Sequence, residues 1–307
     1  MKNLFITSIF LFASSLFLLA QNTQVVFVQD DMSNDFRKAQ VLAVQKHIQS
    51  LDGVDFRYTD AKGSLSLFIY QLEKAITKGV DIVLIGTPSA SAITPALKKA
   101  KAKGVKTLII DRGVTSNEYT AFIHSDNIEI GKIAGEYLAQ KLHGKGTILL
   151  LEGLPKADVT QLRTQGFTQA LRAYPNIKVI KRVANYLRKD AITVTEKLLN
   201  DKVDFDAVFS QSDSMLVGVR SVFNARGLDF SKKISIGCDY IAQAKKAILN
   251  GTQSASVKFP LAGKESVEIV RRLITNQPIP KRILIPIEIV TRDNASKIEP
   301  IFWKHSI

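Results

Sequence analysis

The segment TLIIDRG, residues 107–113, ends a run of apolar and β-branched residues with an Asp-Arg pair, Asp111 and Arg112. A carboxylate accepts hydrogen bonds, and a guanidinium donates several of them in a planar fork. Side by side at the end of a buried strand, the two groups suit a small polar ligand. The alternative is an ion pair in a surface turn, which binds nothing. The surrounding elements decide between these two possibilities.

The chain around this pair alternates strand-like runs with longer segments of helical spacing. From residue 23 the runs TQVVFV, VDFRYTD, VDIVLIG and VKTLIID are separated by segments whose apolar residues recur at helical spacing. The first of these segments, residues 34–51, has Ser33 or Asn34 as its N-cap. Strands that are nearly continuous apolar runs indicate a parallel sheet covered by helices on both faces.

The same pattern starts again after residue 125. Asp126 is placed to cap a helix that runs to about Leu142, and the strand-like runs GTILLLEG, IKVIKRVA, DAVFSQ and KISIGCD follow. We therefore expect an α/β protein with two similar doubly wound lobes. The N-terminal lobe is expected to span residues 21–125 plus about 260–286, and the C-terminal lobe 126–259 plus about 287–307. The segments QSASVKF and RILIPIEIV remain at the end of the chain, enough to cross between the lobes again.

The first twenty residues, MKNLFITSIFLFASSLFLLA, place Lys2 before an apolar run that ends at Ala20. This order predicts a secretory signal peptide over residues 1–20 and export of the rest of the chain. Leu18 stands where small residues are preferred, and the apolar run approaches the ~20 residues that span a bilayer. An uncleaved N-terminal anchor is therefore the alternative.

Several classes of metal and cofactor site are not indicated. Cys238 is the only cysteine, which excludes an intramolecular disulfide, and its strand-like surroundings predict a small buried side chain. The four histidines are scattered without metal-ligand spacing. Neither G-x-G-x-x-G nor G-x-x-x-x-G-K-[ST] nor G-x-S-x-G occurs. We expect no metal and no cofactor, and an enzyme is the weaker class of function.

The chain is strongly basic, with a net charge of +14. Such an excess can indicate nucleic acid, an anionic membrane or an anionic ligand as partner. Here the Lys and Arg residues are spread along the chain, with no dense arm and no aromatic interleaving. A solvated basic surface is therefore expected, and nucleic acid is not expected as a partner.

Polar and aromatic groups follow most of the predicted strands at their carboxyl ends, which is where open parallel sheets bind ligands. Carboxylates accept hydrogen bonds from hydroxyl pairs, guanidinium groups donate to hydroxyl or ring oxygens, and aromatic rings cover C–H faces. The set suits a neutral sugar or polyol. Helix capping is the alternative role for the Asp and Ser residues, most of all for Asp213. The groups are Asp30, Thr87, Asp111, Arg112, Tyr186, Ser212 and Asp239.

Four segments together carry a family resemblance that covers nearly all of residues 24–290, in order and at matching spacing. The segments TLIIDRGVTSNEYTAFIHSDNIEIGKIAGEYLAQKL, LRTQGFTQAL, AVFSQSDSMLVGV and SIGCDY resemble elements of the ribose-binding type of periplasmic sugar-binding protein. The resemblance implies the type I periplasmic binding protein fold, with two lobes joined by a hinge of three crossings. It also implies a periplasmic protein that closes on a small sugar or polyol.

The resemblance assigns ligand contacts to both lobes. It implies Asn34, Phe36, Asp111 and Arg112 in the first lobe, and Arg163, Tyr186 and Asp239 in the second, with Tyr186 stacking on the sugar. Thr87, Ser212 and Arg37 stand where the family has other polar or aromatic residues, and either Lys258 or Phe259 stands at a Gln position. Arg37, followed by an otherwise family-like helix, resembles the pattern of members that bind other furanoses or pyranoses. Arg37 together with Lys258 is also compatible with an anionic group on the ligand.

The leading hypothesis is a monomeric solute-binding protein that presents a sugar or polyol to the permease of an ABC importer. The alternative is a sensor protein that signals to a chemoreceptor or a histidine kinase, with an anionic sugar-like ligand as a variant. A lac-repressor-like regulator would need a helix-turn-helix domain where residues 1–23 hold the signal-peptide pattern. A secreted α/β enzyme is the last alternative, since the fold alone does not exclude catalysis.

Overall fold

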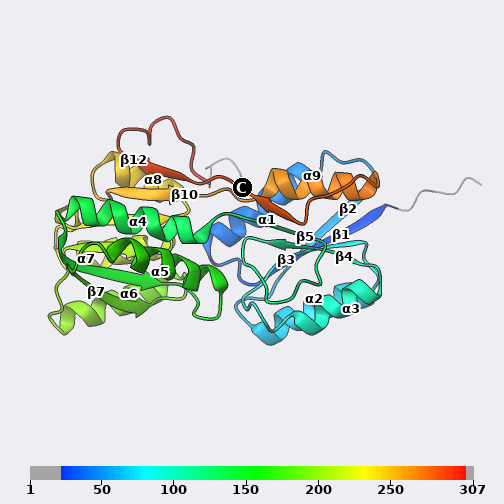
Figure 1. The fold of residues 1–307 in the computed structure, drawn as a ribbon, viewed down its shortest axis with the longest axis horizontal. Helices are drawn as coiled ribbons and strands as arrows, with labels where there is room; N and C mark the ends of the chain where they lie inside the picture. Colours follow the sequence, from blue (N-terminus) through cyan, green and yellow to red (C-terminus); the bar gives the residue numbers. More distant parts are fainter. Residues whose placement is uncertain (1–21, 302–307) are drawn as a thin grey trace, which may run out of the picture.

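The computed structural model describes residues 22–301, which form two α/β lobes lying side by side (Figure 1). Each lobe contains one six-stranded sheet. The predicted signal peptide, residues 1–20, lies outside the described residues. Within residues 22–301, no helix has the length and apolar character needed to cross a membrane.

The N-terminal lobe has the strand order β11-β5-β4-β3-β1-β2, and all neighbouring strands are parallel. Figure 1 shows α2 and α3 on one side of this sheet and α1 and α9 on the other. The strands are β1 (Thr23–Gln29), β2 (Val54–Asp60), β3 (Ile82–Gly86), β4 (Lys106–Ile110), β5 (Ala121–His124) and β11 (Arg282–Leu284). The helices are α1 (Asp35–Ile48), α2 (Leu65–Thr77), α3 (Thr94–Ala102) and α9 (Gly263–Ile274).

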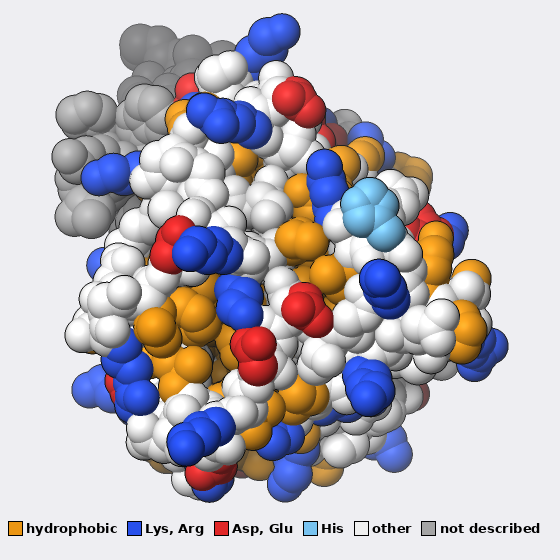
Figure 2. All heavy atoms as spheres, turned by 90° about the vertical axis from the view of Figure 1, so that its left-hand side faces the viewer, with side chains coloured by type: hydrophobic (Ala, Val, Ile, Leu, Met, Phe, Trp, Pro, Cys, Tyr) orange, Lys and Arg blue, Asp and Glu red, His pale blue; other side chains and the backbone are white. Residues whose placement is uncertain are grey.

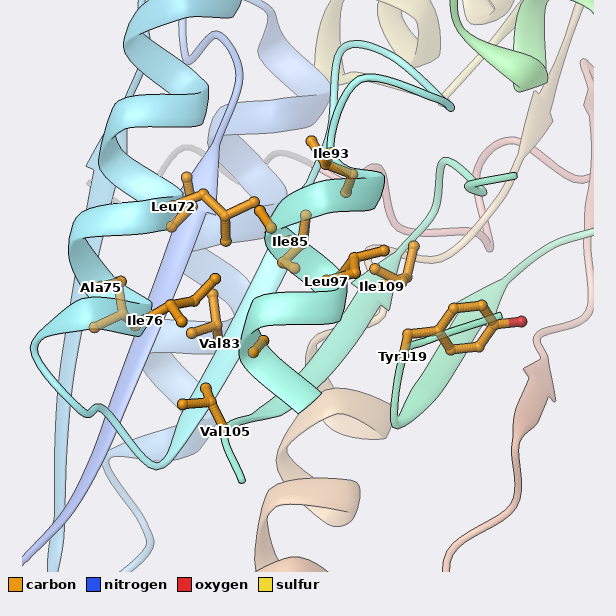
Figure 3. Close-up of a cluster of buried hydrophobic side chains, with 14 of the residues drawn as sticks. Leu72, Ala75, Ile76, Val83, Ile85, Ile93, Leu97, Val105, Ile109 and Tyr119 are labelled. Atoms are coloured by element: carbon orange, nitrogen blue, oxygen red, sulfur yellow. The ribbon is translucent and has the colours of Figure 1, made fainter. Parts of the chain in front are cut away.

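The apolar runs of these strands are buried on both faces, as the sequence predicts. Along β3, Val83 and Ile85 pack with α2 and α3, while Ile82 and Leu84 pack with α1 and α9. Successive side chains of a strand point to opposite faces, so one continuous apolar run supplies both layers. Figure 3 shows the first of these clusters, in which Leu97 of α3 lies near the side chains of β3.

The C-terminal lobe repeats this plan with the order β12-β10-β9-β8-β6-β7, and only β12 is antiparallel to its neighbour. Helices α4 and α5 pack on one face of the sheet, and α6 and α7 on the other. The strands are β6 (Lys145–Glu152), β7 (Asn176–Val183), β8 (Ala207–Ser210), β9 (Ile234–Cys238), β10 (Ala255–Lys258) and β12 (Glu288–Thr291). The helices are α4 (Asn127–Lys141), α5 (Asp158–Leu171), α6 (Arg188–Asn200), α7 (Asp213–Ala225) and α8 (Ala242–Leu249), with the 3₁₀ turn η1 (Phe230–Lys232).

Three chain segments cross between the lobes, and they confirm the two-lobe fold with its three-part hinge. They join β5 to α4, β10 to α9, and β11 to β12. The run RILIPIEIV, expected as one strand, is divided at this third crossing, so that its two halves pair in different sheets. Pro286 lies between the halves and has no backbone N–H for a sheet ladder. The edge strands β2 and β7 lie at the opposite end of each sheet, away from the hinge.

The helix caps agree with the sequence in two cases and differ in one. Asp126 caps α4, and Asn34 rather than Ser33 caps α1. The expectation that Asp213 caps α7 is wrong: Ser212 is the cap and accepts a hydrogen bond from the Met215 backbone amide. The Asp213 carboxylate is fully buried instead, where it accepts hydrogen bonds from the side chains of Gln253 and Ser256.

Candidate ligand-binding site

A cavity of about 20 Å³ lies between the two lobes at the carboxyl ends of their strands. We call it the inner cavity. A volume of this size holds about one water molecule, so the lobes are closed more tightly here than they can be around a sugar ring. Ten of the eleven lining residues are among those predicted from the sequence. The lining residues are Asn34, Phe36, Arg37, Asp111, Arg112, Val159, Arg163, Tyr186, Ser212, Asp239 and Phe259.

The N-terminal lobe contributes two buried arginines that are held by two buried aspartates. Nη2 of Arg37 lies 2.6 Å from Oδ2 of Asp111, and Nε of Arg37 lies 3.7 Å from Oδ1 of Asp30. Nη1 of Arg112 lies 2.5 Å from Oδ2 of Asp30 and also donates to the backbone carbonyl of Thr87 at 3.2 Å. Buried charges are tolerated when they are paired in this way. The pairing fixes the positions of Asp111 and Arg112 at the cavity wall.

In the C-terminal lobe, Arg163 is held by two groups that the sequence did not single out as site residues. Its Nε donates to Oδ1 of Asn127 at 2.8 Å, and its Nη1 donates to the backbone carbonyl of Gln211 at 2.7 Å. The contact with Asn127 requires α4 and α5 to lie close together. Gly131 of α4 permits this approach, because a Cβ atom there would overlap the carbonyl oxygen of Arg163.

Asp111 and Asp239 occupy equivalent positions in the two lobes. Each follows a strand, β4 or β9, and each donates its backbone N–H to the neighbouring strand, to Ile123 and Val257 respectively. Both have positive φ, 66° and 99°, which is uncommon for residues other than glycine. Backbone strain of this kind costs about 1–3 kcal/mol and persists where the surroundings enforce it. The two lobes thus present one carboxyl group each to the same cavity.

Each of these two aspartates has one buried oxygen without a hydrogen-bond partner among the described residues. The atoms are Oδ1 of Asp111 and Oδ2 of Asp239, and Nε of Arg112 is in the same situation. Burial raises the pKa of Asp239 well above its usual range, and the charge of Arg163 opposes this rise. Unpaired buried polar atoms cost about 1–3 kcal/mol each, so a ligand that pairs with them removes an existing penalty.

Aromatic rings from both lobes complete the cavity wall. Phe36 and Phe259 come from opposite lobes, and their ring centroids lie 4.5 Å apart. The hydroxyl of Tyr186 is hydrogen-bonded to Oγ1 of Thr160 at 2.7 Å, and its ring lies against Gly153, where a larger residue would overlap it. Rings fixed in this way can cover the apolar C–H faces of a small polar ligand.

Direct hydrogen bonds between the lobes hold the closed arrangement. Nδ2 of Asn34 donates to the carbonyl of Tyr186 at 2.9 Å. Oδ2 of Asp35 accepts hydrogen bonds from Nη2 of Arg188 at 3.0 Å and from Oγ of Ser214 at 2.6 Å. The Gly113 amide of the N-terminal lobe also donates to Oδ2 of Asp158 in the C-terminal lobe, at 2.8 Å. These bonds exist only when the lobes meet, so they stabilise the closed state relative to an open one.

Three predicted residues do not line the inner cavity. Asp30 lies behind the wall, where it pairs with Arg112, and the Thr87 hydroxyl donates to the carbonyl of Ser89.

Lys258 is only half-buried and lies at the end of β10, in register with Glu288. Neighbouring residues of an extended chain point to opposite sides, so the structure brings Phe259 rather than Lys258 to the cavity. Val159 is the one lining residue that the sequence did not suggest, because an apolar side chain in a helix carries no site signal.

The described residues also show how basic side chains and possible metal ligands are distributed. Figure 2 views the C-terminal-lobe end of the molecule, and the Lys and Arg side chains on this face are scattered among neutral groups. No cluster of His, Cys, Asp and Glu side chains suited to a metal ion occurs within residues 22–301. Cys238 is fully buried in the core, as predicted.

Comparison with known proteins gives one consistent family. The model of a family described as periplasmic binding protein domain matches residues 25–278. The ribose import binding protein of Bacillus subtilis (strain 168) is 32% identical over 244 residues, which is 78% of each chain. The galactofuranose-binding protein of Escherichia coli (strain K12) is 27% identical over 267 residues, or 84% of each chain.

A solved structure shows the same similarity in three dimensions. The periplasmic binding protein component of the arabinose ABC transporter from Shewanella sp. ANA-3, bound to α- and β-L-arabinofuranose, is 25% identical with a TM-score of 0.84. The match covers 89% of this chain and 93% of that one. These relatives are binding proteins and not enzymes. The chain therefore belongs to the periplasmic binding protein family and, within it, to the ribose-binding type.

Proposed function

We propose that the protein captures a neutral sugar or polyol between its lobes in the periplasm and presents it to the permease of an ABC importer. The observation that carries this proposal is the pair Asp111 and Asp239, which face one inter-lobe cavity and each keep a buried oxygen unpaired. Hydroxyl groups are the donors that such oxygens need. The rings of Phe36, Tyr186 and Phe259 supply the apolar surface that a sugar ring also requires.

The charge pairing favours a neutral ligand over an anionic one. Arg37 is held by Asp111 and Asp30, and Arg112 is held by Asp30, so neither arginine is a free cation. Lys258, the other cation behind the anionic alternative, lines neither this cavity nor the space beside it. At Arg37 and Arg112, an anion would have to compete with aspartates that are already within hydrogen-bond distance. Arg163 is hydrogen-bonded to neutral groups, and the charge it presents to the cavity acts on Asp239. We infer that these groups recognise hydroxyl and ring oxygens instead.

Ligand binding and lobe closure are coupled in this proposal. Each lobe supplies one aspartate, one or more arginines and aromatic surface, so a ligand contacts its full set of partners only in the closed form. A ligand shifts such an equilibrium only by the difference in its affinity for the two states. Closed protein then becomes the species that a membrane partner recognises.

The import role has more support than the sensor alternative. The curated relative from Bacillus subtilis is named as an import binding protein, and the related solved structure is a component of an ABC transporter. The proposal also includes export by the signal-peptide pattern of residues 1–20. A sensor function would use the same closed state and differ only in the partner.

A thermal-melt screen tests the proposed ligand class. The chain from Gln21 onward is unfolded and refolded to remove bound ligand, then heated with millimolar pentoses, hexoses, polyols, and their phosphorylated or acidic forms. A ligand at about 100 times its Kd adds ~2.7 kcal/mol of stability, enough for a clear rise in Tm. We expect the rise with neutral sugars or polyols. The proposal is contradicted if only the anionic forms raise Tm, or if none of the carbohydrates raises it.

A further inference from the structure

A second and larger cavity, of about 510 Å³, lies between the lobes beside the inner cavity. We call it the vestibule. Both cavities are lined by Asn34, Arg37, Arg112 and Tyr186, so they meet at these side chains. The other vestibule residues follow β1, β2 and β3 in one lobe and β6 and β7 in the other. Since β2 and β7 are the edge strands opposite the hinge, the vestibule is the outer part of the cleft.

We propose that the vestibule is a second ligand subsite, and that it holds a hydroxyl-bearing second ring joined to the sugar of the inner cavity. The ligand class is then a disaccharide or another glycoside with a polar second unit. This inference rests on the proposed function, because it takes the inner cavity as the site of the first ring.

The size and walls of the vestibule suit a second ring. A volume of about 510 Å³ lies within the ~300–1,000 Å³ range of pockets that bind small molecules. Both lobes contribute apolar side chains to it: Leu65 and Pro88 from the N-terminal lobe, and Leu154, Pro155 and Leu187 from the C-terminal lobe. Apolar walls on two sides can cover the C–H faces of a ring whose edges carry hydroxyl groups.

Polar groups of the vestibule favour a hydroxyl-bearing unit over an apolar one. Asp30 lines the vestibule and not the inner cavity, and it is 2% exposed. Its Oδ1 lies 3.7 Å from Nε of Arg37, beyond hydrogen-bond distance, and accepts no hydrogen bond among the described residues. Nε of Arg112, at the junction of the two cavities, also lacks a partner. A carboxylate oxygen needs a donor and a guanidinium N–H needs an acceptor, and a hydroxyl group serves as either. An apolar substituent would leave both atoms unpaired.

The arrangement also links the second ring to closure. Vestibule residues come from both lobes, so a ring bound there contacts its full set of partners only when the lobes are closed. The second unit therefore adds to the preference of the ligand for the closed state. A ligand of two rings is expected to bind more tightly than its first ring alone.

Calorimetric titration of matched ligands tests the inference. The stripped chain from Gln21 is titrated with each neutral monosaccharide that raises its Tm, with the methyl glycosides of that sugar, and with disaccharides that contain it in each linkage. We expect at least one disaccharide to bind tenfold or more tightly than the monosaccharide. If every methyl glycoside and every disaccharide binds more weakly than the free monosaccharide, the inference is overturned. The proposed function is not affected by that result.

Two variants locate the effect in the vestibule. Leu65 is half-buried, begins α2 and belongs to neither core cluster of its lobe, so Leu65→Trp should fold and fill the vestibule from the N-terminal side. Leu187→Trp fills it from the other lobe. Leu228→Trp is the matched control, because Leu228 is 44% exposed and lines neither cavity.

We expect Leu65→Trp and Leu187→Trp to remove the tenfold advantage of the disaccharide, with the Kd of the monosaccharide unchanged within about twofold. Leu228→Trp should leave both Kd values unchanged. If the two vestibule variants weaken both ligands equally, or weaken neither, the second subsite is refuted while the sugar-binding proposal survives. If no carbohydrate binds the wild-type chain, both proposals fail together.

Discussion

Arg37 and Asp111 form a buried ion pair in which Nη2 lies 2.6 Å from Oδ2, with 4% and 6% of the two side chains exposed. The pair joins helix α1 to the end of β4. The pair holds the Asp111 carboxylate at the inner cavity, with Oδ1 free of hydrogen bonds to the described residues. It also neutralises the guanidinium of Arg37, which was the main argument for an anionic ligand. Removing one partner of such an ion pair leaves the charge of the other buried and uncompensated.

The first prediction concerns Asp111. Asp111→Ala removes the unpaired oxygen that the proposal assigns to a ligand hydroxyl. We expect sugar affinity to fall roughly tenfold to a hundredfold, the equivalent of about 1–3 kcal/mol, as measured by calorimetric titration. Glu118→Ala is the control, since Glu118 follows the same strand but pairs with Lys101 at the surface. Equal affinities of wild type and Asp111→Ala would remove Asp111 from the site.

The second prediction concerns ligand charge. A neutral ligand gains no long-range attraction from Arg37, so the wild-type Kd should change less than about threefold between roughly 0.05 and 0.5 M NaCl. Arg37→Met should weaken binding at both salt concentrations, because Asp111 and Asp30 lose their shared cation. Titrations at the two concentrations measure both effects. A tenfold or greater loss of wild-type affinity at high salt would indicate an anionic ligand and contradict the charge argument.

The third prediction concerns the inter-lobe contacts of Asp35. Asp35→Ala deletes the hydrogen bonds from Arg188 and Ser214 and should shift the ligand-free protein toward open forms. Because the Asp35 side chain is 37% exposed, we expect a modest effect of about 0.5–1 kcal/mol, or a two- to fivefold weaker Kd. Small-angle scattering of the ligand-free variant should give a larger radius of gyration than wild type. An unchanged radius together with an unchanged Kd would show that these bonds do not control closure.

The fourth prediction concerns the pH dependence that the buried Asp213 carboxyl imposes. Burial raises its pKa to about 6, against the hydrogen bonds from Ser256 and Gln253 that lower it. The folded state therefore holds a proton more firmly than the unfolded state, and this group's contribution to stability falls as pH rises from about 4 to about 6. The expected loss over that interval is of the order of 3 kcal/mol at most.

Denaturant unfolding of wild type and Asp213→Asn from pH 4 to pH 7 isolates this contribution. The free energy of unfolding of wild type minus that of the variant should decrease with pH across the window. A difference that is flat, or that increases with pH, would contradict a raised pKa for Asp213. Asp204→Asn is a matched control. The Asp204 side chain is exposed, and the hydrogen bond that it accepts from Lys233 lowers the pKa of Asp204 instead of raising it.

The sequence predicts the positions of the two aspartates well because the parallel sheet makes those positions regular. Once strands and helices alternate, the residue after each strand must lie at the ligand edge, which places Asp111 and Asp239 without any knowledge of side-chain contacts. The two-lobe fold follows from the same alternation, the family resemblance implies the three crossings, and the structure confirms both.

What the sequence does not predict depends on contacts between distant elements. The support of Arg163 by Asn127 and Gln211 requires the packing of α4 on α5 and the course of the loop after β8. The choice between Lys258 and Phe259 depends on which way one side chain points from an extended segment, and spacing alone leaves that undecided. The vestibule is formed by loops of both lobes, so it exists only once the lobes are closed.

The crystal structure of the chain with the sugar that most raises its Tm is the most direct test of the central claim. The account predicts one sugar ring in the inner cavity, with hydroxyl oxygens within about 3 Å of Oδ1 of Asp111 and of Oδ2 of Asp239. It also predicts that the ring lies against Phe36, Tyr186 or Phe259. A bound sugar that contacts neither aspartate would contradict the account.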